Sequence, residues 1–275
     1  MRSKPFWISF VVALCVISAV SLAVGLLVYP AGRTPAAGSV SRADDGDYYL
    51  PTAGDNFSLL AIGSDEVSGK LSGVSMIRFD VANGKVPVVT LPTAMLVPYK
   101  TGSATLEAIY AEVGVTALMK ALAQYFSVSL NRYIDVTRDG FIKSINIAGS
   151  VKSAAAAGGQ TLDGARLYDV MQKAAYPGGE KERLYTVSQT VADIINQKAS
   201  LFLLSNGPDV LSAILANTKT DISAGDIEDA YGALRFMAKL SAKPAYAAEI
   251  GGSIGAEGSF VMGDATKKMI TQAFS

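Results

Sequence analysis

Residues 56–98 constrain the fold of this chain most strongly, because they contain three consecutive runs of β-favouring side chains. We expect strands at residues 57–62, 74–81 and 86–91. Asn83 and Gly84 separate the last two runs, and an Asn-Gly pair there favours a type I′ hairpin turn, in which both residues have positive φ. The stretch is therefore predicted to form a β-meander on which the other segments pack. Its loops after residues 62 and 91 are the first places to look for chemistry.

Composition removes several classes of function. The 275 residues are half apolar, which is enough for one sizeable core. Basic and acidic residues balance at 24 each, so no concentrated basic face is available for nucleic acid. The chain has no histidine, the commonest general base, and its single cysteine is Cys15 in the first apolar segment. Disulfide frameworks, cysteine-based zinc sites and a cysteine nucleophile in the folded domain are therefore excluded.

The N-terminal part has the pattern of a membrane anchor. Residues 1–5 carry basic side chains, and residues 6–29 follow without any charge. About 20 apolar residues cross the hydrocarbon core as a helix, and positive charge before the span places the N-terminus in the cytoplasm. A cleavable signal peptide is the alternative, but its apolar region is usually only about 7–15 residues long. Residues 30–54 are predicted to be a flexible linker, and residues 55–275 an extracellular domain of a single-pass cell-membrane protein.

Helical and strand-like patterns alternate beyond the meander. We expect two helices in residues 103–126, broken near Gly114, then a strand at 133–136 and a helix that Thr137 caps. Further helices are expected at residues 161–173, 184–205, 208–216, 227–240 and from 264 onward, with a strand at 259–262. This mixture predicts an α/β fold: an α-β-α sandwich with a central mixed sheet, preceded by one N-terminal transmembrane helix.

Five segments, in order, resemble the LytR-CpsA-Psr family. Residues 57–65 (FSLLAIGSD) resemble its first strand and Gly-Ser-Asp turn, and residues 88–92 (VVTLP) resemble the strand before its Ser-Ile-Pro-Arg-Asp motif. Residues 108–114 (AIYAEVG) are similar to its tyrosine-containing segment, residues 133–141 (YIDVTRDGF) to its strand–helix segment, and residues 162–164 (LDG) to the segment before its Tyr-Arg motif. Order and spacing are kept over roughly residues 56–197.

The resemblance implies an anchored enzyme that moves glycopolymers from a polyprenyl-pyrophosphate lipid onto peptidoglycan outside the cell. Arginines and a carboxylate-held Mg²⁺ suit such a reaction, because pyrophosphate concentrates negative charge. The lipid tail needs an apolar slot in the core. The implied partners are the membrane, a polyprenyl-phosphate lipid or cell-wall glycan, and an active relative of the same family, but not nucleic acid.

Several charged positions of the family pattern are not kept here. The family's arginine before the second strand corresponds to Leu71, and its metal-binding aspartate corresponds to Gly73. The arginine and aspartate after the third strand correspond to Thr93 and Ala94. Removing a single stabilising donor typically costs about 10²–10³ in rate, so losing several predicts a member without the ordinary transfer activity. We expect no metal and no cofactor, because the position of the Mg²⁺ ligand is Gly73.

Four residues remain as candidates for a site. Asp65 is clearly kept, and Gln189 matches the glutamine of a later family motif. Lys173 and Arg183 lie near the family's later arginines and would form a shifted basic set. Asp65, Lys173 and Arg183 are therefore candidate catalytic residues, and Gln189 is a candidate substrate-binding residue.

Simpler structural roles compete with these assignments. Asp65 has the position of a strand-end aspartate that accepts hydrogen bonds from its own turn. Asp135 and Asp139 flank a strand end, where capping and solvent exposure are expected rather than metal binding. Asp226 follows Ser223 in a plausible helix start, so capping accounts for it.

Three functions stay open at this point. The chain is a noncatalytic, lipid- or glycan-binding member acting in cell-envelope biogenesis, or a scaffold on the same fold whose pocket is filled by Leu71, Met95 and Leu96. The third interpretation is an active phosphotransferase that uses Lys173 or Arg183.

Overall fold

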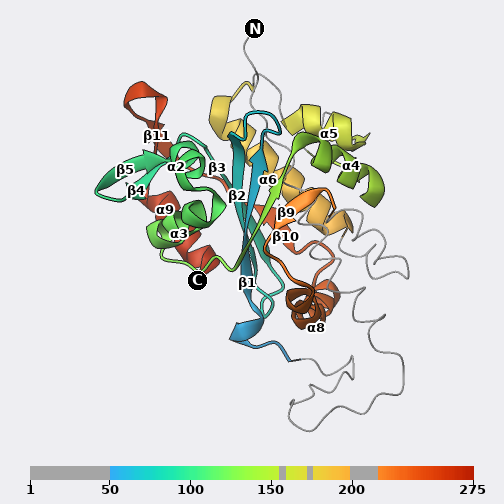
Figure 1. The fold of residues 1–275 in the computed structure, drawn as a ribbon. Helices are drawn as coiled ribbons and strands as arrows, with labels where there is room; N and C mark the ends of the chain where they lie inside the picture. Colours follow the sequence, from blue (N-terminus) through green and yellow to red (C-terminus); the bar gives the residue numbers. More distant parts are fainter. Residues whose placement is uncertain (1–49, 155–158, 172–175, 199–215) are drawn as a thin grey trace.

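The computed structural model describes residues 50–154, 159–171, 176–198 and 216–275 (Figure 1). The predicted anchor at residues 6–29, most of the linker, most of the helix expected at 208–216 and the end of the helix expected at 184–205 lie outside these ranges. Within the described ranges, no helix is both long and apolar enough to cross a membrane.

A six-stranded mixed sheet forms the centre of the domain. Its strand order is β10-β3-β2-β1-β6-β9. The strands are β1 (Phe57–Ser64), β2 (Leu71–Phe79), β3 (Val86–Leu91), β6 (Arg132–Val136), β9 (Thr218–Thr220) and β10 (Ala245–Ala247). β2 pairs antiparallel with β1 and β3, whereas β6 runs parallel to β1 and β10 parallel to β3. The carboxyl ends of β1, β3 and β6 therefore meet at one end of the sheet.

The predicted meander is confirmed, with longer first and second strands than expected. β1 pairs with β2 from Phe57 opposite Phe79 to Ser64 opposite Leu71, with an irregularity near Gly63 and Ser64. Both strands are almost entirely buried because they lie inside the sheet, which explains their near-continuous apolar runs.

The turn between β2 and β3 differs from the predicted type I′ turn. An antiparallel bridge joins Asp80 to Lys85, so four residues form the loop instead of two. Of Asn83 and Gly84, only Gly84 has positive φ, at 60°. Asn83 instead donates from its side chain to Asp80, 2.8 Å away. A four-residue loop places fewer demands on φ than a two-residue turn, and the Asn-Gly pair is compatible with both.

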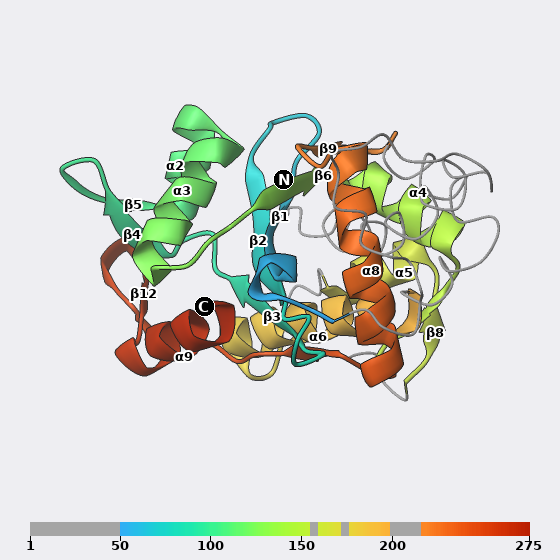
Figure 2. The ribbon, with the colours of Figure 1, turned by 90° about the horizontal axis from the view of Figure 1, so that it is seen from below.

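Helices cover both faces of the sheet, which confirms the mixed α/β class (Figure 2). On one side lie α2 (Leu106–Val113), α3 (Val115–Phe126) and α9 (Asp264–Phe274), and on the other lie α4 (Arg138–Ala148), α5 (Gly164–Met171), α6 (Gly179–Lys198) and α8 (Ala224–Leu240). α6 packs on β3 and β10. Gly114, with φ 78°, separates α2 from α3, as predicted.

Side-chain caps fix the starts of three of these helices. The hydroxyl of Thr105 accepts from the backbone of α2, and that of Thr137 accepts from the backbone of α4, as expected for Thr137. Ser223 and Asp226 form a reciprocal capping box at the start of α8. The capping role predicted for Asp226 is therefore confirmed.

The remaining elements are short, and the patterns placed some of them wrongly. They are η1 (Ala53–Asp55), β4 (Leu96–Tyr99), β5 (Gly102–Thr105), β7 (Val151–Lys152), β8 (Thr161–Leu162), β11 (Gly252–Ile254), η3 (Ala256–Gly258) and β12 (Phe260–Met262). The hairpin β4–β5 occupies the place where the first helix of residues 103–126 was expected to begin, and β8 the start of the helix expected at 161–173. Two- to four-residue strands carry too little periodicity to be recognised from sequence.

Candidate functional site

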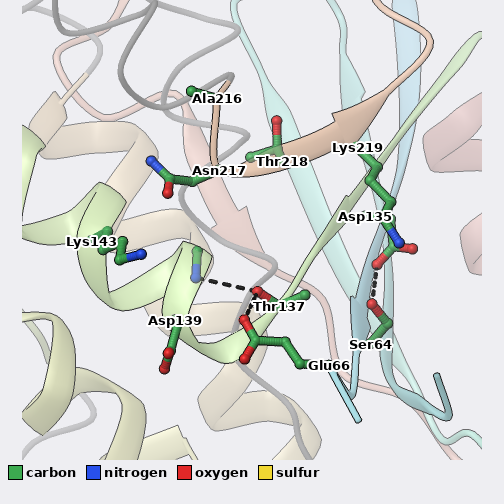
Figure 3. A pocket seen from close by; sticks show the side chains of 11 residues that line it. Ser64, Glu66, Asp135, Thr137, Asp139, Lys143, Ala216, Asn217, Thr218 and Lys219 are labelled. Carbon is green, nitrogen blue, oxygen red and sulfur yellow. Dashed lines mark hydrogen bonds between the residues drawn. The ribbon is translucent and has the colours of Figure 1, made fainter. Parts of the chain in front are cut away.

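A cavity of about 260 Å³ lies at the carboxyl ends of β1 and β6 (Figure 3). Ligands of open α/β sheets bind at such strand ends. We refer to this feature as the strand-end cavity. Its lining comes from four elements and the residues beside them: Ser64, Glu66, Asp135, Thr137, Asp139, Gly140, Lys143, Ala216, Asn217, Thr218 and Lys219.

The floor of the strand-end cavity holds a buried carboxylate. Asp135 is only 6% exposed, which contradicts the solvent exposure expected from the sequence. Its Oδ1 accepts from the hydroxyl of Ser64 at 2.6 Å, and its Oδ2 accepts from the hydroxyl of Tyr110 at 2.8 Å. Burial, followed by the charge of Asp135, raises the pKa of the Tyr110 hydroxyl well above its usual value, so Tyr110 stays a donor.

The rim of the strand-end cavity carries exposed charges of both signs. Glu66 accepts a hydrogen bond from the hydroxyl of Thr137, which joins the loop after β1 to the start of α4. Asp139 and Lys143 belong to α4, and Lys219 lies on β9 opposite Asp135 in the strand pairing. The exposure expected for Asp139 is confirmed. Acceptors and donors thus surround one small space.

Gly140 allows the two walls of the strand-end cavity to approach closely. A Cβ built at this position would overlap the carbonyl oxygen of Asn217 and lie 3.2 Å from Val136 Cγ1. Any larger residue would therefore push α4 away from the segment that leads into β9.

Asp65 binds its own loop. Its Oδ1 accepts from the backbone N–H groups of Val67 and Ser68, at 3.0 and 2.6 Å, and from the hydroxyl of Ser68 at 2.9 Å. These bonds, first that from the Ser68 backbone, hold the pKa of the Asp65 carboxyl below its usual value. The observed geometry is that of a strand-end aspartate in its turn.

The other candidates from the sequence also contact near neighbours. Arg183, in the first turns of α6, forms an ion pair with Glu180, with its Nε 2.6 Å from Oε2. Gln189 donates to Asp193 at 3.2 Å, one helical turn along α6. Lys173 lies outside the described residues. None of Asp65, Arg183 and Gln189 lines the strand-end cavity.

The positions where the family carries charges form a second region at the same end of the sheet. We refer to Leu71, Gly73, Thr93 and Ala94 as the uncharged loop region. Leu71 is 4% exposed, and Gly73 pairs with Gly63 within the sheet. The backbone of Thr93 accepts from the start of α2, and that of Ala94 accepts from Phe260 of β12.

The uncharged loop region does not fit a magnesium ion held as in the family pattern. Gly73 has no side-chain oxygen, and three donors from its own loop already occupy one carboxylate oxygen of Asp65. Mg²⁺ prefers oxygen ligands in octahedral geometry. Among the described residues, no group of three or more acidic, cysteine or histidine side chains is placed to hold a metal.

Three buried hydroxyls connect the sheet to α6. The hydroxyls of Ser75 on β2 and Thr90 on β3 are 2.6 Å apart, and that of Ser188 on α6 lies 2.8 Å from Thr90 Oγ1. The N–H of Thr90 donates to Ser188 Oγ at 2.9 Å. All three residues are at most 1% exposed. This hydroxyl ladder holds α6 directly against the strands, so no space separates them at this level.

Sequence reasoning missed the strand-end cavity. The sequence predicts Ser64 only as part of a turn, and Asp135 as a capping or solvent-exposed residue. The polar residues at the ends of residues 57–64 and 132–136 were the available signal. It becomes informative only when β1 and β6 are known to run parallel and adjacent.

Comparisons with known proteins identify relatives that are named as teichoic acid transferases. No family model matches the chain. TagU of Bacillus mycoides, a polyisoprenyl-teichoic acid–peptidoglycan teichoic acid transferase, is 27% identical over 190 residues, which are 62% of either chain. TagU of Bacillus anthracis gives the same identity and coverage. The chain thus spans less than two thirds of the length of these curated relatives.

Solved structures share the fold. A transcription-regulator structure from Eubacterium siraeum superposes with a TM-score of 0.72 at 15% identity, over 87% of this chain and 98% of that one. TagT bound to LI-WTA gives a TM-score of 0.65 at 15% identity, over 82% and 92%. TagU of Bacillus subtilis gives 0.58 at 16% identity, over 80% and 95%.

Three observations agree on one family resemblance: the five ordered segments, the similarity to TagU and the shared fold. The chain resembles the LytR-CpsA-Psr family: it is similar in sequence to TagU and shares the fold of TagU and TagT.

Proposed function

We propose that this chain is a membrane-anchored, extracellular member of cell-envelope biogenesis that binds a polyprenyl-phosphate lipid or a cell-wall glycan without transferring the polymer. The observation that carries the proposal is the uncharged loop region: no ionisable side chain stands at Leu71, Gly73, Thr93 or Ala94. Relatives named as teichoic acid transferases support the link to wall polymers.

Electrostatics argue against ordinary transfer chemistry. Moving a group off a pyrophosphate requires positive charge aimed at the leaving oxygens, and each lost donor costs about 10²–10³ in rate. Leu71 is apolar and buried, and Gly73 contributes only backbone. The described arginine closest to the expected set, Arg183, is already paired with Glu180. Several such losses together remove most of the stabilisation that the reaction needs.

A scaffold with a filled pocket is the second candidate. Its specific support is the burial of Leu71 and Met95, which are 4% and 0% exposed, together with the hydroxyl ladder between β3 and α6. Leu96 is half-buried. A domain closed at these places would act through its surface, for example on an active relative of the same family.

Membrane anchoring is part of the proposal. Its support is the uncharged stretch at residues 6–29 behind a basic N-terminus. The domain at residues 55–275 would then lie outside the cell, where peptidoglycan is found.

A transfer assay tests the proposal directly. The full chain, purified in detergent, is incubated with Mg²⁺, peptidoglycan and teichoic acid linked to a polyprenyl-pyrophosphate lipid, and TagU of Bacillus mycoides is the positive control. We expect no transfer above the protein-free reaction. Transfer that is abolished by Lys173→Ala or Arg183→Ala, but kept in the exposed-arginine control Arg166→Ala, would establish the active-enzyme interpretation instead.

Lipid binding separates the two noncatalytic candidates. Vesicles with and without polyprenyl phosphate are titrated with the full chain. Binding that depends on the polyprenyl phosphate favours the lipid-binding member, whereas equal recovery with both vesicles favours the scaffold.

A further inference from the structure

We propose that the outer edge of β11 pairs with the same edge of a second copy of this chain. The two copies would then share one antiparallel sheet, related by a twofold axis at Ser253. We refer to the three residues of β11, Gly252–Ile254, as the β11 edge. The inference goes beyond the proposed function and does not depend on it.

The backbone groups of the β11 edge point away from β12. The two strands pair antiparallel, with Ile254 opposite Phe260. The N–H of Phe260 donates to the carbonyl oxygen of Ala94 on the other side of β12, so Phe260 and Ile254 form a pair without mutual hydrogen bonds. Such pairs alternate with hydrogen-bonded pairs along antiparallel strands. Gly252 and Ile254 therefore direct their N–H and C=O groups outward, whereas Ser253 directs its own towards β12.

The β11 edge is exposed. Within the described part of the chain, β11 pairs only with β12. All three residues of β11 are exposed, and Ile254 is exposed to 66%. Figure 1 shows that the hairpin of β11 and β12 projects from the domain. An incoming strand could therefore reach the donors and acceptors of this edge, as strands do when they extend a sheet.

β10, an edge strand of the central sheet, is protected from such pairing. The side chain of Asn196 donates to the carbonyl oxygen of Ala245 at 2.9 Å and accepts from the N–H of Ala245 at 2.9 Å. Native proteins cover or charge their exposed edges, because unpaired edges associate with other strands. The β11 edge has no charged residue and no such covering side chain among the described residues. The chain thus covers part of one edge and leaves another available.

The β11 edge matches a copy of itself. A twofold axis at Ser253 places Gly252 opposite Ile254 of the second copy. Each of these residues directs one donor and one acceptor at the other, so that about four hydrogen bonds join the two copies. A contact in which the same surface meets itself closes at a dimer and does not continue into a fibre.

The apolar side chains of the paired edges also fit together. The ring of Phe260 lies over Gly252, where an added Cβ would overlap the ring. Side chains that are directly opposite in an antiparallel pair lie on the same face of the sheet. Ile254 of the second copy would therefore pack beside Gly252 and against the ring of Phe260, and this contact would remove exposed apolar surface from water.

The charges near the β11 edge are compatible with self-association. None of residues 252–254 and 260–262 is charged, so no like charges meet at the centre of the contact. Further out, Glu257 of one copy approaches Glu249 of the other, whose carboxylate is already paired with Lys181, with Nζ 3.1 Å from Oε2. A charged partner, in contrast, would find no opposite charge on the β11 edge.

Disulfide cross-linking of the full chain in detergent measures this pairing. The two Ser253 residues would form a pair without mutual hydrogen bonds, with Cα atoms about 4.5 Å apart, and a disulfide spans about 4.4–6.8 Å. Ser253→Cys is combined with Cys15→Ser, which removes the chain's own cysteine. We expect a disulfide-linked dimer on a non-reducing gel after treatment with oxidised glutathione.

Matched variants separate pairing from random collision. Ser103→Cys, also with Cys15→Ser, is the control, because Ser103 is an exposed serine on the short strand β5. We expect Ser253→Cys to cross-link at least about tenfold faster, since pairing raises the effective concentration of the thiols. Adding Ile254→Lys, at an exposed position, should slow this reaction about tenfold, because a lysine opposes edge pairing. Val67→Lys adds the same charge at a 97% exposed valine and should leave the rate within about twofold.

Two results would overturn the inference: Ser253→Cys cross-links no faster than Ser103→Cys, or Ile254→Lys leaves the fast rate unchanged. A lipid surface is the other occupant that an exposed apolar hairpin could have. Cross-linking at the control rate, together with protection of the Ser253→Cys thiol from a water-soluble maleimide in phosphatidylglycerol vesicles, would assign the β11 edge to lipid and refute the dimer.

Discussion

The uncharged loop region and the strand-end cavity lie at the same end of one sheet but have opposite character. β1, β3 and β6 run in the same direction, so the loop after β3 and the ends of β1 and β6 share that end. On the β2–β3 side stand Leu71, Gly73, Thr93 and Ala94, without a charge. On the β1–β6 side stand three carboxylates and two lysines.

The contrast shows that the fold of this chain does not by itself determine which groups stand at the ends of its strands. The parts that build the sheet are kept, because their apolar side chains supply the buried surface that stabilises the domain. The charges that a pyrophosphate would require are absent from one region, while a buried acid is maintained in another. Function therefore has to be argued from the groups present in each region and not from the fold.

Restoring the family's arginine in the uncharged loop region should have the largest effect. Leu71→Arg places a charge at a position that is 4% exposed, so we expect a loss of about 3 kcal/mol in unfolding free energy by urea denaturation. Leu71→Met keeps the volume and should cost less than about 1.5 kcal/mol. An arginine variant as stable as the wild type would show an open site there and would remove the contrast between the two regions.

Adding a side chain at Gly140, where α4 approaches Asn217 beside the strand-end cavity, should have the next largest effect on stability. Gly140→Ala introduces a Cβ against the carbonyl oxygen of Asn217, and overpacking of this kind costs about 2 kcal/mol. Thermal unfolding measures the loss. Alanine at Gly102, where a Cβ meets nothing within 4 Å, is the matched control and should change stability little. Equal effects at the two glycines would mean that the walls of the cavity are not closely packed.

Loosening the hydroxyl ladder should have a smaller effect. β10 pairs with β3 only along residues 86–88, so the N–H of Thr90 depends on Ser188 Oγ. Ser188→Ala leaves this buried donor without its partner and should cost about 1 kcal/mol in urea denaturation. Thr186→Ala, at a residue beside the ladder on α6, serves for comparison. A fully stable Ser188→Ala chain, or one that gains polyprenyl phosphate binding, would show that the ladder does not close the sheet against α6.

Acid should have the smallest effect of the four changes. It should lower the local stability of β9 and α8 before that of α6. The Arg132 guanidinium, more than any other group, lowers the pKa of the Asp226 carboxyl from 3.8 to about 2. A lowered pKa means that this pair stabilises the fold above pH 3.8 and that the contribution is lost as pH falls from there towards 2. Because the pair is only partly buried, solvent screens it and the loss is small. Hydrogen exchange should show faster opening of β9 and α8 over this range, and Asp226→Asn should remove the pH dependence; an unchanged dependence would contradict the assignment.

The sequence predicted those parts of the fold that depend on local pattern. β1, β2 and β3 are neighbours along the chain and each contains a run of apolar residues, so their positions and their order could be predicted. Gly114 marked the break between α2 and α3, because its positive φ suits glycine. The hairpin type was missed because Asn83-Gly84 is compatible with both a short and a longer loop.

Long-range pairing decided what the sequence did not reveal. β10 joins the sheet next to β3 although about 155 residues separate them, and nothing in the three residues Ala245–Ala247 indicates that partner. The strand-end cavity depends in the same way on β1, β6 and β9. The absence of charged side chains, in contrast, is visible directly in the sequence: neither Leu71 nor Gly73 has a side-chain group that binds a metal or a pyrophosphate, whatever the fold.

Hydrogen exchange of the full chain with and without the peptidoglycan disaccharide tests the central contrast most directly. We expect added protection at residues 64–66, 135–143 and 216–219, around the strand-end cavity, and none at residues 71–73 or 93–96. Protection confined to residues 71–73, 93–96 and 183–189 would contradict it, because the ligand would then occupy the uncharged loop region.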